Sequence, residues 1–419
     1  MASINLLSNT SRVETPFIKV TIGEYTFGVF DRKVSKGTDS YGNYTINNIK
    51  YPNYIQSLQI EKINGAVNKY TLVMSYPVTD ADDPNFFYKV FSSVSQTRKI
   101  VFSYGDLSAP TYCYRDEEAI ILKVRQTMNA SSAVIQYTVS AVSSGKLLTS
   151  GARDFPGGKY QPSNLIKDIL YNPQYGLQDV FYGMTNKELV EQEGLILSDD
   201  IEVTLEAKNN ISVLDYLYYL VASMTDSPNN NLKKDSFYSL VVVDDVSGKF
   251  KGPYFKIIKT NVVKEMPAAF DLDIGYPSQN IILNFDVEDD EGYTIFYNFN
   301  EELNTDEYVQ RINDRGELEE VYAPILSSGN LVKKTTEAEK TWWTKITQFP
   351  IKARLTIKGL LRPAILMTHV RLNVYFYGRK HVSSGLYIVT KQVDNVSAQG
   401  FRTTLSLLRI GKSTDLDIV

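Results

Sequence analysis

Histidine and cysteine are almost absent from this chain, whose 419 residues include two histidines and one cysteine. A single cysteine, Cys113, cannot form an internal disulfide bond, which excludes the disulfide frameworks of small secreted proteins. Two histidines leave little room for a histidine-based catalytic triad or a histidine metal site. Because His369 and His381 lie in or beside expected strands, we interpret both as structural.

Long apolar runs and a positive excess are also missing. The longest apolar-looking stretch, Val213–Met224, is interrupted by Asp215 and is shorter than the roughly 20 residues that a bilayer span needs. Residues 1–20 lack the basic start and apolar run of an export signal. The formal net charge is −4, without the concentrated positive surface that nucleic-acid binding requires. The sequence therefore predicts a protein made in the cytoplasm, with no stable membrane insertion.

The common catalytic motifs do not occur. The sequence contains no Cys-x-x-Cys, no glycine-rich phosphate loop with a lysine and no His-Glu-x-x-His. Paired carboxylates could serve a glycosidase, and the candidate clusters are Glu288–Glu291, Asp199–Asp200 and Glu117–Glu118. Each cluster lies beside an expected turn or strand end, where solvated carboxylates are ordinary, and the spacing of a calcium loop is absent. We predict no enzyme activity, no catalytic residue, no metal site and no cofactor.

Tyrosine and phenylalanine are abundant, with 29 and 19 copies, and aromatic rings favour pleated sheets and contact surfaces. Apolar and polar residues alternate on both sides of Asn64–Gly65, which predicts a tight hairpin. A second, longer hairpin is expected on either side of residues 129–132, because residues 135–141 alternate in the same way. These patterns predict that the first part of the chain is a β domain.

The middle of the chain has a different pattern. Gly151–Pro162 is rich in glycine and proline and is predicted to be a linker. A helix is expected from Ser163, a second short one from the capping box of Thr185 and Glu188, and a third over Ser212–Met224. Strands are expected at residues 238–243 and 250–258, joined by a turn at 244–248.

Strands return towards the end of the chain. Residues 351–358 alternate strictly between apolar and polar, and residues 385–410 predict a closing hairpin. Residues 300–340 are acidic and polar with few strand signals, so a surface insertion is expected there. Trp342 and Trp343 stand at the start of the final domain, and we interpret them as a buried seam or a subunit or partner contact in preference to a ligand site.

The predicted fold is α+β and β-dominated, with two tube-like β-barrel domains and a helix-containing middle region. The expected boundaries are 1–148 for the first barrel, 149–270 for the α+β middle domain, 271–340 for the start of the second β domain with its acidic loop-rich insertion, and 341–419 for the main part of the second barrel. Both β regions end in a strand, a polar connection and a returning strand, which suggests internal duplication of a small barrel.

The closing segments Gly385–Val389 (Gly-Leu-Tyr-Ile-Val) and Gly400–Arg409, together with Ser163–Leu170 (Ser-Asn-Leu-Ile-Lys-Asp-Ile-Leu), resemble phage tail baseplate hub proteins. This contractile-tail hub family is related to the base of VgrG spikes and to tail-tip proteins. The resemblance covers most of the chain. It implies a ring-shaped homotrimer that carries six similar modules and adapts a six-fold tail tube to a three-fold spike.

The resemblance also implies partners and a location. The expected partners are the tail tube protein, the spike protein and baseplate wedge proteins, with the tape measure protein as a further candidate. DNA would pass through the lumen without specific binding, and the protein would belong to the virion tail baseplate after assembly in the host cytoplasm. The alternatives are a tail-associated cell-wall hydrolase and a carbohydrate- or receptor-binding tail protein.

Overall fold

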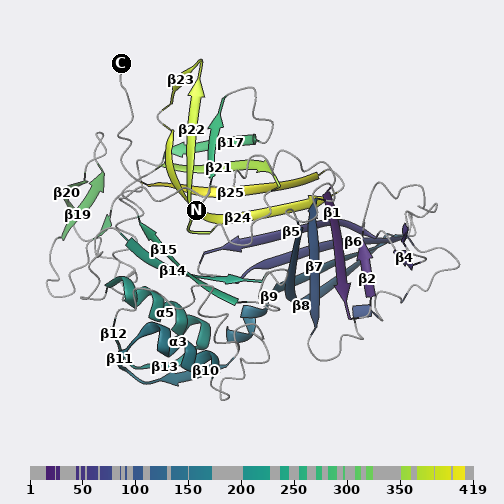
Figure 1. The fold of residues 1–419 in the computed structure, drawn as a ribbon, viewed down its shortest axis with the longest axis horizontal. Coiled ribbons are helices and arrows are strands. Elements are labelled where there is room, and N and C mark those ends of the chain that lie inside the picture. The colour runs from purple at the N-terminus through teal and green to yellow at the C-terminus, as the bar shows by residue number, and fades with distance from the viewer. Residues whose placement is uncertain are drawn as a thin grey trace.

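The computed structural model describes residues 16–23, 25–28, 44–46, 49–51, 54–64, 67–77, 85, 90–91, 98–106, 114–129, 134–149, 151–171, 202–226, 236–244, 254–261, 270–275, 282–289, 296–297, 307–312, 318–323, 351–359, 366–381, 383–397 and 400–410. Strands dominate the described residues, among which two α-helices, α3 and α5, lie in the middle of the chain, so the fold is β-dominated α+β (Figure 1). We call residues 16–143 the first region, 144–261 the middle region and 270–410 the last region.

The first region is a sheet whose order is β5-β6-β9-β8-β7-β1-β2. Its strands are β1 (Pro16–Ile22), β2 (Tyr25–Gly28), β5 (Ile55–Ile63), β6 (Lys69–Pro77), β7 (Lys99–Asp106), β8 (Tyr114–Asn129) and β9 (Val134–Ser143), and β3 (Tyr44–Ile46) pairs separately with β4 (Ile49–Tyr51). The two predicted hairpins are confirmed as β5–β6 and β8–β9. Alternating side chains of these strands form one buried cluster.

The middle region packs two helices against short strands. Its elements are η2 (Ser144–Thr149), β10 (Ala152–Phe155), β11 (Gly158–Tyr160), α3 (Pro162–Tyr171), β12 (Val203–Leu205), β13 (Lys208–Ser212), α5 (Val213–Asp226), β14 (Ser236–Val243) and β15 (Tyr254–Asn261). The helices predicted at Ser163 and at Ser212–Met224 are confirmed as α3 and α5, and the strand pair as β14–β15. The short helix expected at Thr185 lies outside the described residues.

The linker predicted at Gly151–Pro162 is wrong, because this segment forms β10 and β11, which pair with β13 and β12. Phe155 is the physical reason: its buried ring stacks on Tyr216 of α5 at 3.8 Å between centroids. Burial and stacking of an aromatic ring stabilise the strand that carries it. The composition of the segment therefore marks tight strand ends and not an unstructured connection.

The last region contains β16 (Phe270–Ile274), β17 (Ile282–Asp289), β21 (Ile351–Lys358), β22 (His369–Phe376), β23 (Arg379–Lys380), β24 (Gly385–Ser397) and β25 (Gly400–Ile410). The expected closing hairpin is confirmed as β24–β25. Between residues 296 and 323 lie β18 (Phe296–Tyr297), β19 (Glu307–Ile312) and β20 (Leu318–Ala323), which form a separate sheet. The segment 300–340, expected to be a surface insertion, thus contains the strand pair β19–β20, since backbone pairing does not require apolar side chains.

Six strands of the last region repeat the arrangement of six strands of the first. In chain order, β1, β5, β6, β7, β8 and β9 correspond to β16, β17, β21, β22, β24 and β25. The first set lies side by side as β1-β7-β8-β9-β6-β5 and the second as β16-β22-β24-β25-β21-β17. The pairs are antiparallel in both sets, except that β16 runs parallel to β22 whereas β1 runs antiparallel to β7. This shared order supports the duplication suggested by the sequence.

The irregularities of the strands repeat as well. In the hairpins β8–β9 and β24–β25 the register shifts at Leu122 and at Thr390, each seven positions before the end of its strand. In the pairs β5–β6 and β17–β21 it shifts at Gln56 and at Leu283, each the second residue of its strand. Because bulges fix the register of a strand pair, the correspondence holds residue by residue.

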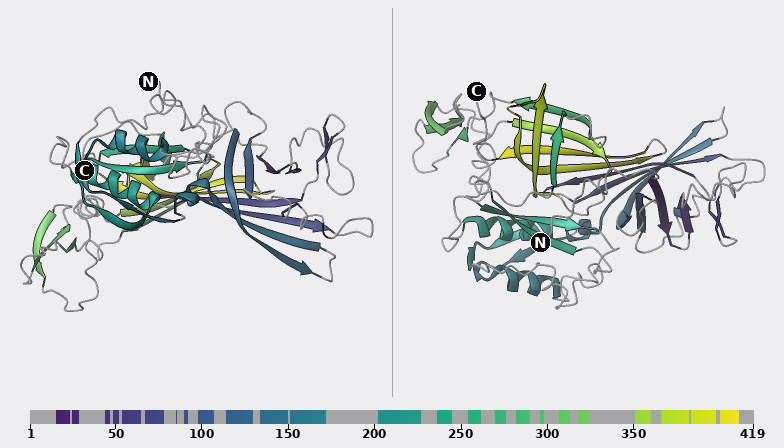
Figure 2. Two further views of the ribbon diagram at one scale, coloured as in Figure 1. Left: turned by 90° about the horizontal axis from the view of Figure 1, so that it is seen from below. Right: turned by 45° about the horizontal axis from the view of Figure 1, so that its top comes forward.

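The described residues form three buried clusters. One fills the first region, one fills the last, and the third lies between α3, α5 and the strands of the middle region. Strand β14 contributes side chains to two of these clusters. Val241 and Val243 belong to the cluster of the last region, and Leu240 and Val242 belong to the cluster around the helices. Figure 2 shows the strands of the first region extending away from the other two regions.

Candidate functional site at the sheet junction

The two β regions are joined edge to edge. Strand β24 of the last region pairs antiparallel with β5 of the first, with Lys391 opposite Ile63 and Ser397 opposite Ser57. This pairing makes one continuous sheet from β17 to β2. Across the junction the Nζ atom of Lys391 lies 2.6 Å from the Oε1 atom of Glu61. The pair is partly exposed, so its main effect is to favour this register.

Apolar side chains of the last region complete the core of the first. Val396 of β24 and Phe401 of β25 are buried in the cluster of the first region. The ring of Phe401 meets that of Tyr104 edge to face, with centroids 5.9 Å apart. The backbone of Gly359 passes so close to this ring that a β-carbon there would lie 2.2 Å from it. The junction is therefore a packed interior as well as a hydrogen-bonded edge.

A buried charge lies beneath the junction at Glu117 of β8. Its Oε1 atom accepts hydrogen bonds from the Nζ atom of Lys62 at 2.5 Å and from the hydroxyl of Tyr104 at 2.7 Å. The hydroxyl of Tyr70 lies 2.8 Å from Oε2. Burial alone would raise the pKa of Glu117, but the Lys62 ammonium and these hydrogen bonds outweigh it and hold the pKa below its usual value. Glu117 is therefore ionised and paired.

A second carboxyl, Asp244 at the end of β14, adjoins the first. It accepts hydrogen bonds from Asn68 at 2.7 Å and from Ser143 at 2.5 Å. Burial, reinforced by the charge of Glu117, raises its pKa to about 7 in spite of those hydrogen bonds. The backbone amide of Glu118 also donates to its carbonyl oxygen at 3.0 Å. Asp244 thus fastens the middle region to the first sheet.

Tyr70 connects the two carboxyls. Its hydroxyl lies 2.8 Å from Oε2 of Glu117 and 2.8 Å from Oδ2 of Asp244. One hydroxyl proton can serve only one of these contacts, so a proton on Asp244 completes the other. Burial and the two neighbouring carboxylates raise the pKa of Tyr70 well above its usual value, so the phenol keeps its proton.

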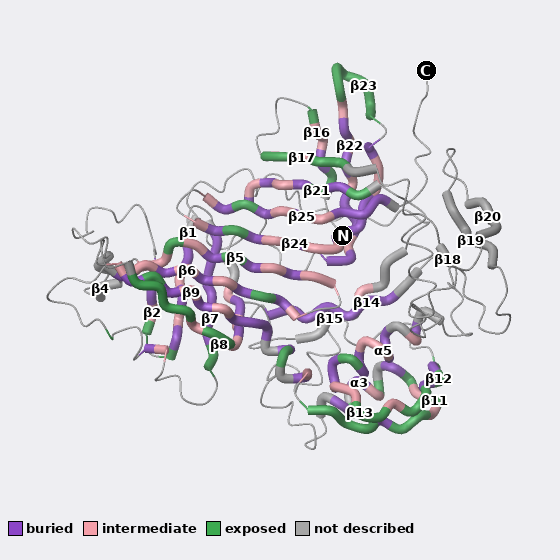
Figure 3. The backbone as a smooth tube through the Cα atoms, turned by 180° about the vertical axis from the view of Figure 1, so that it is seen from behind, coloured by how far each residue is buried: buried purple, intermediate pink, exposed green. Residues whose placement is uncertain are grey.

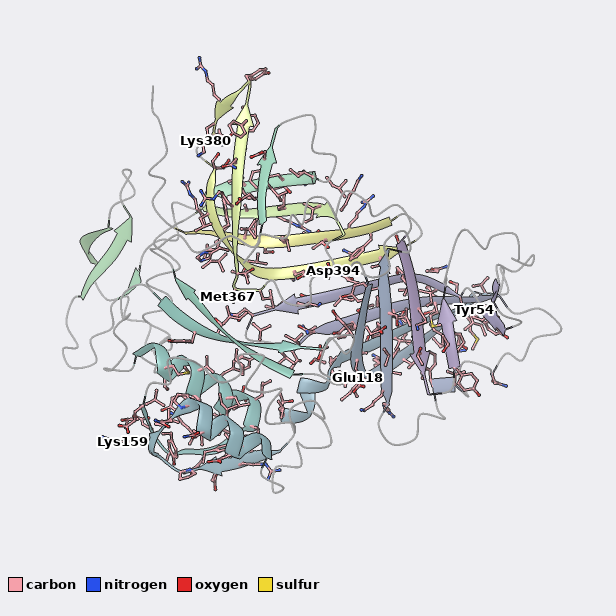
Figure 4. All side chains as sticks on the ribbon, in the orientation of Figure 1. Tyr54, Glu118, Lys159, Met367, Lys380 and Asp394 are labelled. Atoms are coloured by element: carbon pink, nitrogen blue, oxygen red, sulfur yellow. The ribbon has the colours of Figure 1, made fainter. Side chains whose placement is uncertain are left out.

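A third buried carboxyl, Asp394, lies on β24 at the junction itself (Figure 4). The hydroxyl of Thr403 donates to its Oδ1 atom at 2.6 Å and the amide of Gln392 to its Oδ2 atom at 2.8 Å. Burial raises its pKa to about 6, although the charge of Lys62 acts in the opposite direction. The group therefore gains a proton at mildly acidic pH.

These buried groups are suited to fixing the relative position of the three regions. Glu117, Asp244 and Asp394 all lie inside the protein and accept hydrogen bonds from side chains of several different strands. A buried polar network with satisfied partners favours one arrangement of its elements over its alternatives. The network thus provides specificity of packing.

Two strand edges equivalent to the junction carry no partner strand in the described part of the chain. The far half of β8, residues 123–129, pairs with β9 on one side only, and β17 pairs only with β21. Of the seven exposed large apolar side chains among the described residues, four lie on these strands: Leu122, Met128, Leu283 and Val287. Exposed stretches of β17 are green in Figure 3. Exposed apolar strand edges usually mark a binding surface.

Solved structures similar to this chain include phage tail and secretion-system proteins, the group that the sequence resembles. The 43 kDa tail protein of prophage MuSo2 from Shewanella oneidensis is 11% identical with a TM-score of 0.49, over 94% of this chain and 98% of the other. A tail protein from Neisseria meningitidis is 10% identical with a TM-score of 0.47, over 94% and 97%.

A third structure is the E. coli c3393 protein, a component of the type VI secretion system with structural similarity to the phage T4 tail proteins gp27 and gp5. It is 7% identical with a TM-score of 0.42, over 85% of this chain and 73% of the other. No protein-family model and no curated protein matches the sequence. At such identities and TM-scores, no residue role is transferred from these structures.

The candidate residues from the sequence fall in different places. Trp342 and Trp343 lie outside the described residues, as do Asp199–Asp200 and Cys113. Glu117 and Glu118 point to opposite faces of β8: Glu117 is buried, while Glu118 pairs with Lys99 at 3.0 Å on the surface. They do not form a carboxylate pair for glycoside hydrolysis.

The remaining candidates are structural or only partly described. His369 is buried within β22, and the Nδ1 atom of His381 lies 2.8 Å from the hydroxyl of Ser383 beside β23. Of the acidic run 288–291, the structure describes only the backbone of Glu288 and Asp289. Among the described residues, no three histidine, cysteine or carboxylate side chains are grouped as a metal site would require. None of the described helices is long and apolar enough to cross a membrane.

Sequence reasoning missed the buried charges at Lys62, Asp244 and Asp394. For Lys62 a signal exists, since alternation places it on the same face as the apolar Leu58 and Ile60. Asp244 follows a run of valines, and the sequence predicts that it belongs to the turn at 244–248. Its burial depends on the first sheet, which is distant in sequence.

Proposed function

We propose that this chain is the structural hub of a phage tail baseplate and forms a ring-shaped homotrimer. The observation that carries the proposal is the repeated order of six strands, with the two copies joined edge to edge through β24 and β5. A closed ring needs a matched surface at every contact. Two equivalent sheets in one chain supply six modules from three chains, which suits an adaptor between a six-fold tail tube and a three-fold spike.

The same proposal names the partners. The tail tube protein would stack on one face of the ring and the spike on the other, while baseplate wedge proteins and the tape measure protein would bind at its margins. The net charge of −4 suits a channel through which DNA slides without sticking, because carboxylates repel phosphates. The protein would function in the virion tail, after assembly in the host cytoplasm.

We also propose that the hub has no enzyme activity of its own. The described carboxyls with shifted pKa values are buried and hydrogen-bonded to neighbouring side chains, so they are not available to a substrate. Their place in the molecule suits a role in holding the regions together.

The mass of the purified protein in solution tests the proposal, with negative-stain images of the particles. A trimer of three 47.4 kDa chains with a ring outline is expected, alone or once tail tube and spike proteins are added. A protein that stays monomeric with both partners present would contradict the hub function. Measurement of lytic activity on bacterial cell walls tests the absence of enzyme activity separately.

A further inference from the structure

Each of the two strands that form the β24–β5 junction has a counterpart in the other region: β8 corresponds to β24, and β17 corresponds to β5. In the matched registers, Lys391–Ser397 of β24 correspond to Lys123–Asn129 of β8, and Ser57–Glu61 of β5 correspond to Asn284–Glu288 of β17. Within the chain, β24 pairs with β5. Among the described residues, no strand pairs with the corresponding edges of β8 and β17.

We propose that the far half of β8 in one copy of this chain pairs antiparallel with β17 of the next copy, repeating the β24–β5 junction between chains. This inference rests on the proposed homotrimer and specifies its contact. Strand pairing of this kind joins two sheets through backbone hydrogen bonds, while the side chains on either face give specificity.

The known junction fixes the register of the proposed one. Asp394 lies opposite Ile60, and Val396 lies opposite Leu58. The corresponding pairs between chains are Gln126 with Val287 and Met128 with Phe285.

The exposed side chains fit this register. Val396 is 1% exposed at the known junction, whereas its counterpart Met128 is 69% exposed in the single chain. Ile60 is 0% exposed, whereas its counterpart Val287 is 39% exposed. Pairing would bury both Met128 and Val287, and removal of apolar surface from water favours association.

The charges on the two edges are complementary. Exposed Lys123 and Arg125 are the only charged residues between positions 122 and 129 of β8, whereas β17 carries Asp286, Glu288 and Asp289 and no base. At the known junction, Lys391 pairs with Glu61. Their counterparts are Lys123 and Glu288, so the same ion pair is expected between chains.

The contact is heterologous, since one edge meets a different edge. Such contacts close into a ring when the rotation between copies divides a full turn, and otherwise extend into a filament. Three copies closed in this way contain three internal junctions and three between chains.

Paired cysteines test the contact in the full-length protein. In a Cys113→Ser background, Gln126→Cys combined with Val287→Cys is expected to give a covalent trimer under mild oxidation, resolved by denaturing gel electrophoresis. Each single variant can give at most a dimer. The control pair Gln126→Cys and Lys380→Cys, both exposed but on edges that are not matched, is expected to give no trimer.

A charge exchange provides an independent readout. Lys123→Glu is expected to reduce the trimer fraction at low salt by more than tenfold, and addition of Glu288→Lys is expected to restore it, whereas Lys159→Glu, exposed in the middle region, leaves it unchanged. If the protein forms a trimer that neither crosslinks through positions 126 and 287 nor responds to the charge exchange at 123 and 288, the proposed contact is wrong. The proposed hub function would then be unaffected. Crosslinked filaments without rings would support the edge contact and count against the hub.

Discussion

Lys62 and Glu117 form an ion pair inside the protein. Both are buried, and the ammonium of Lys62 provides the positive charge that keeps Glu117 ionised. Replacing a buried pair by apolar groups can be neutral, but removing one partner leaves an uncompensated charge inside the protein. The ion pair links β5, the strand of the first region that borders the last region, to β8.

Lys62→Met is expected to lower the free energy of unfolding by about 3–5 kcal/mol, because Glu117 keeps its buried position without a counter-charge. Urea denaturation followed by fluorescence measures the change. The matched control is Lys99→Met, which breaks the more exposed pair of Lys99 with Glu118 and should cost about 0–1 kcal/mol. Equal effects of the two variants would contradict the buried charge.

Asp244 gives the protein a pH dependence of definite sign. Its pKa is about 7 in the folded protein against 3.8 ordinarily, so between these values the folded state holds a proton that the unfolded state has released. Stability therefore falls as pH rises from about 4 to about 7, and Asp394, with a pKa of about 6, acts in the same direction.

Asp244→Asn is expected to reduce this fall, since an amide does not titrate. Between pH 4.5 and pH 8, the free energy of unfolding of the variant should fall by about 2–4 kcal/mol less than that of the native protein. Urea denaturation at a series of pH values measures it. Asp271→Asn, at an exposed position of β16, should leave the profile as it is. An unchanged profile in Asp244→Asn would show that this carboxyl is ionised throughout.

Helices and hairpins follow from local patterns in the sequence. Helix α5 begins after Ser212, whose hydroxyl accepts a hydrogen bond from the amide of Asp215 at 3.1 Å and donates to its carboxylate at 2.5 Å. The helix itself was predicted from the helical spacing of apolar residues between Leu214 and Val221. By contrast, β10 and β11 were missed, because their formation depends on the burial of Phe155 against α5.

Ser212→Ala is expected to destabilise the protein by about 1 kcal/mol, the usual contribution of a helix N-cap. Thermal denaturation followed by circular dichroism measures the shift in Tm. Ser223→Ala serves as the control, since the hydroxyl of Ser223 bonds to the carbonyl of Tyr219 within the helix, where a serine contributes little. A larger loss from Ser223→Ala would contradict the role of the cap.

The joining of the two β regions is a property of the complete chain that local patterns do not contain. The sequence predicted the β24–β25 hairpin and the strand β5 separately, but their pairing spans more than 300 positions. The similarity of the two regions appears in the sequence as a pattern of strands, whereas the matched registers depend on pairings between strands that are distant in sequence. Whether each region closes into a barrel stays a prediction.

Phe401→Ala is expected to weaken the first region although it lies in the last. Its ring is buried against Tyr104, so its loss should cost about 3–5 kcal/mol and increase amide hydrogen exchange in β7 as well as in β25. Leu407→Ala removes a buried side chain of the last region's own cluster and should affect exchange mainly there. If β7 remained equally protected in Phe401→Ala, the two cores would be independent.

The β24–β5 pairing sets an order of events during synthesis on the ribosome. Strand β5 leaves the ribosome more than 300 residues before β24, the strand that covers its edge. Until then Leu58 and Ile60 stand at an open edge, where another nascent chain can attach. Chaperone demand should therefore persist until β24 has emerged, and a chain cut short before residue 385 should aggregate even though all strands of its first region are complete.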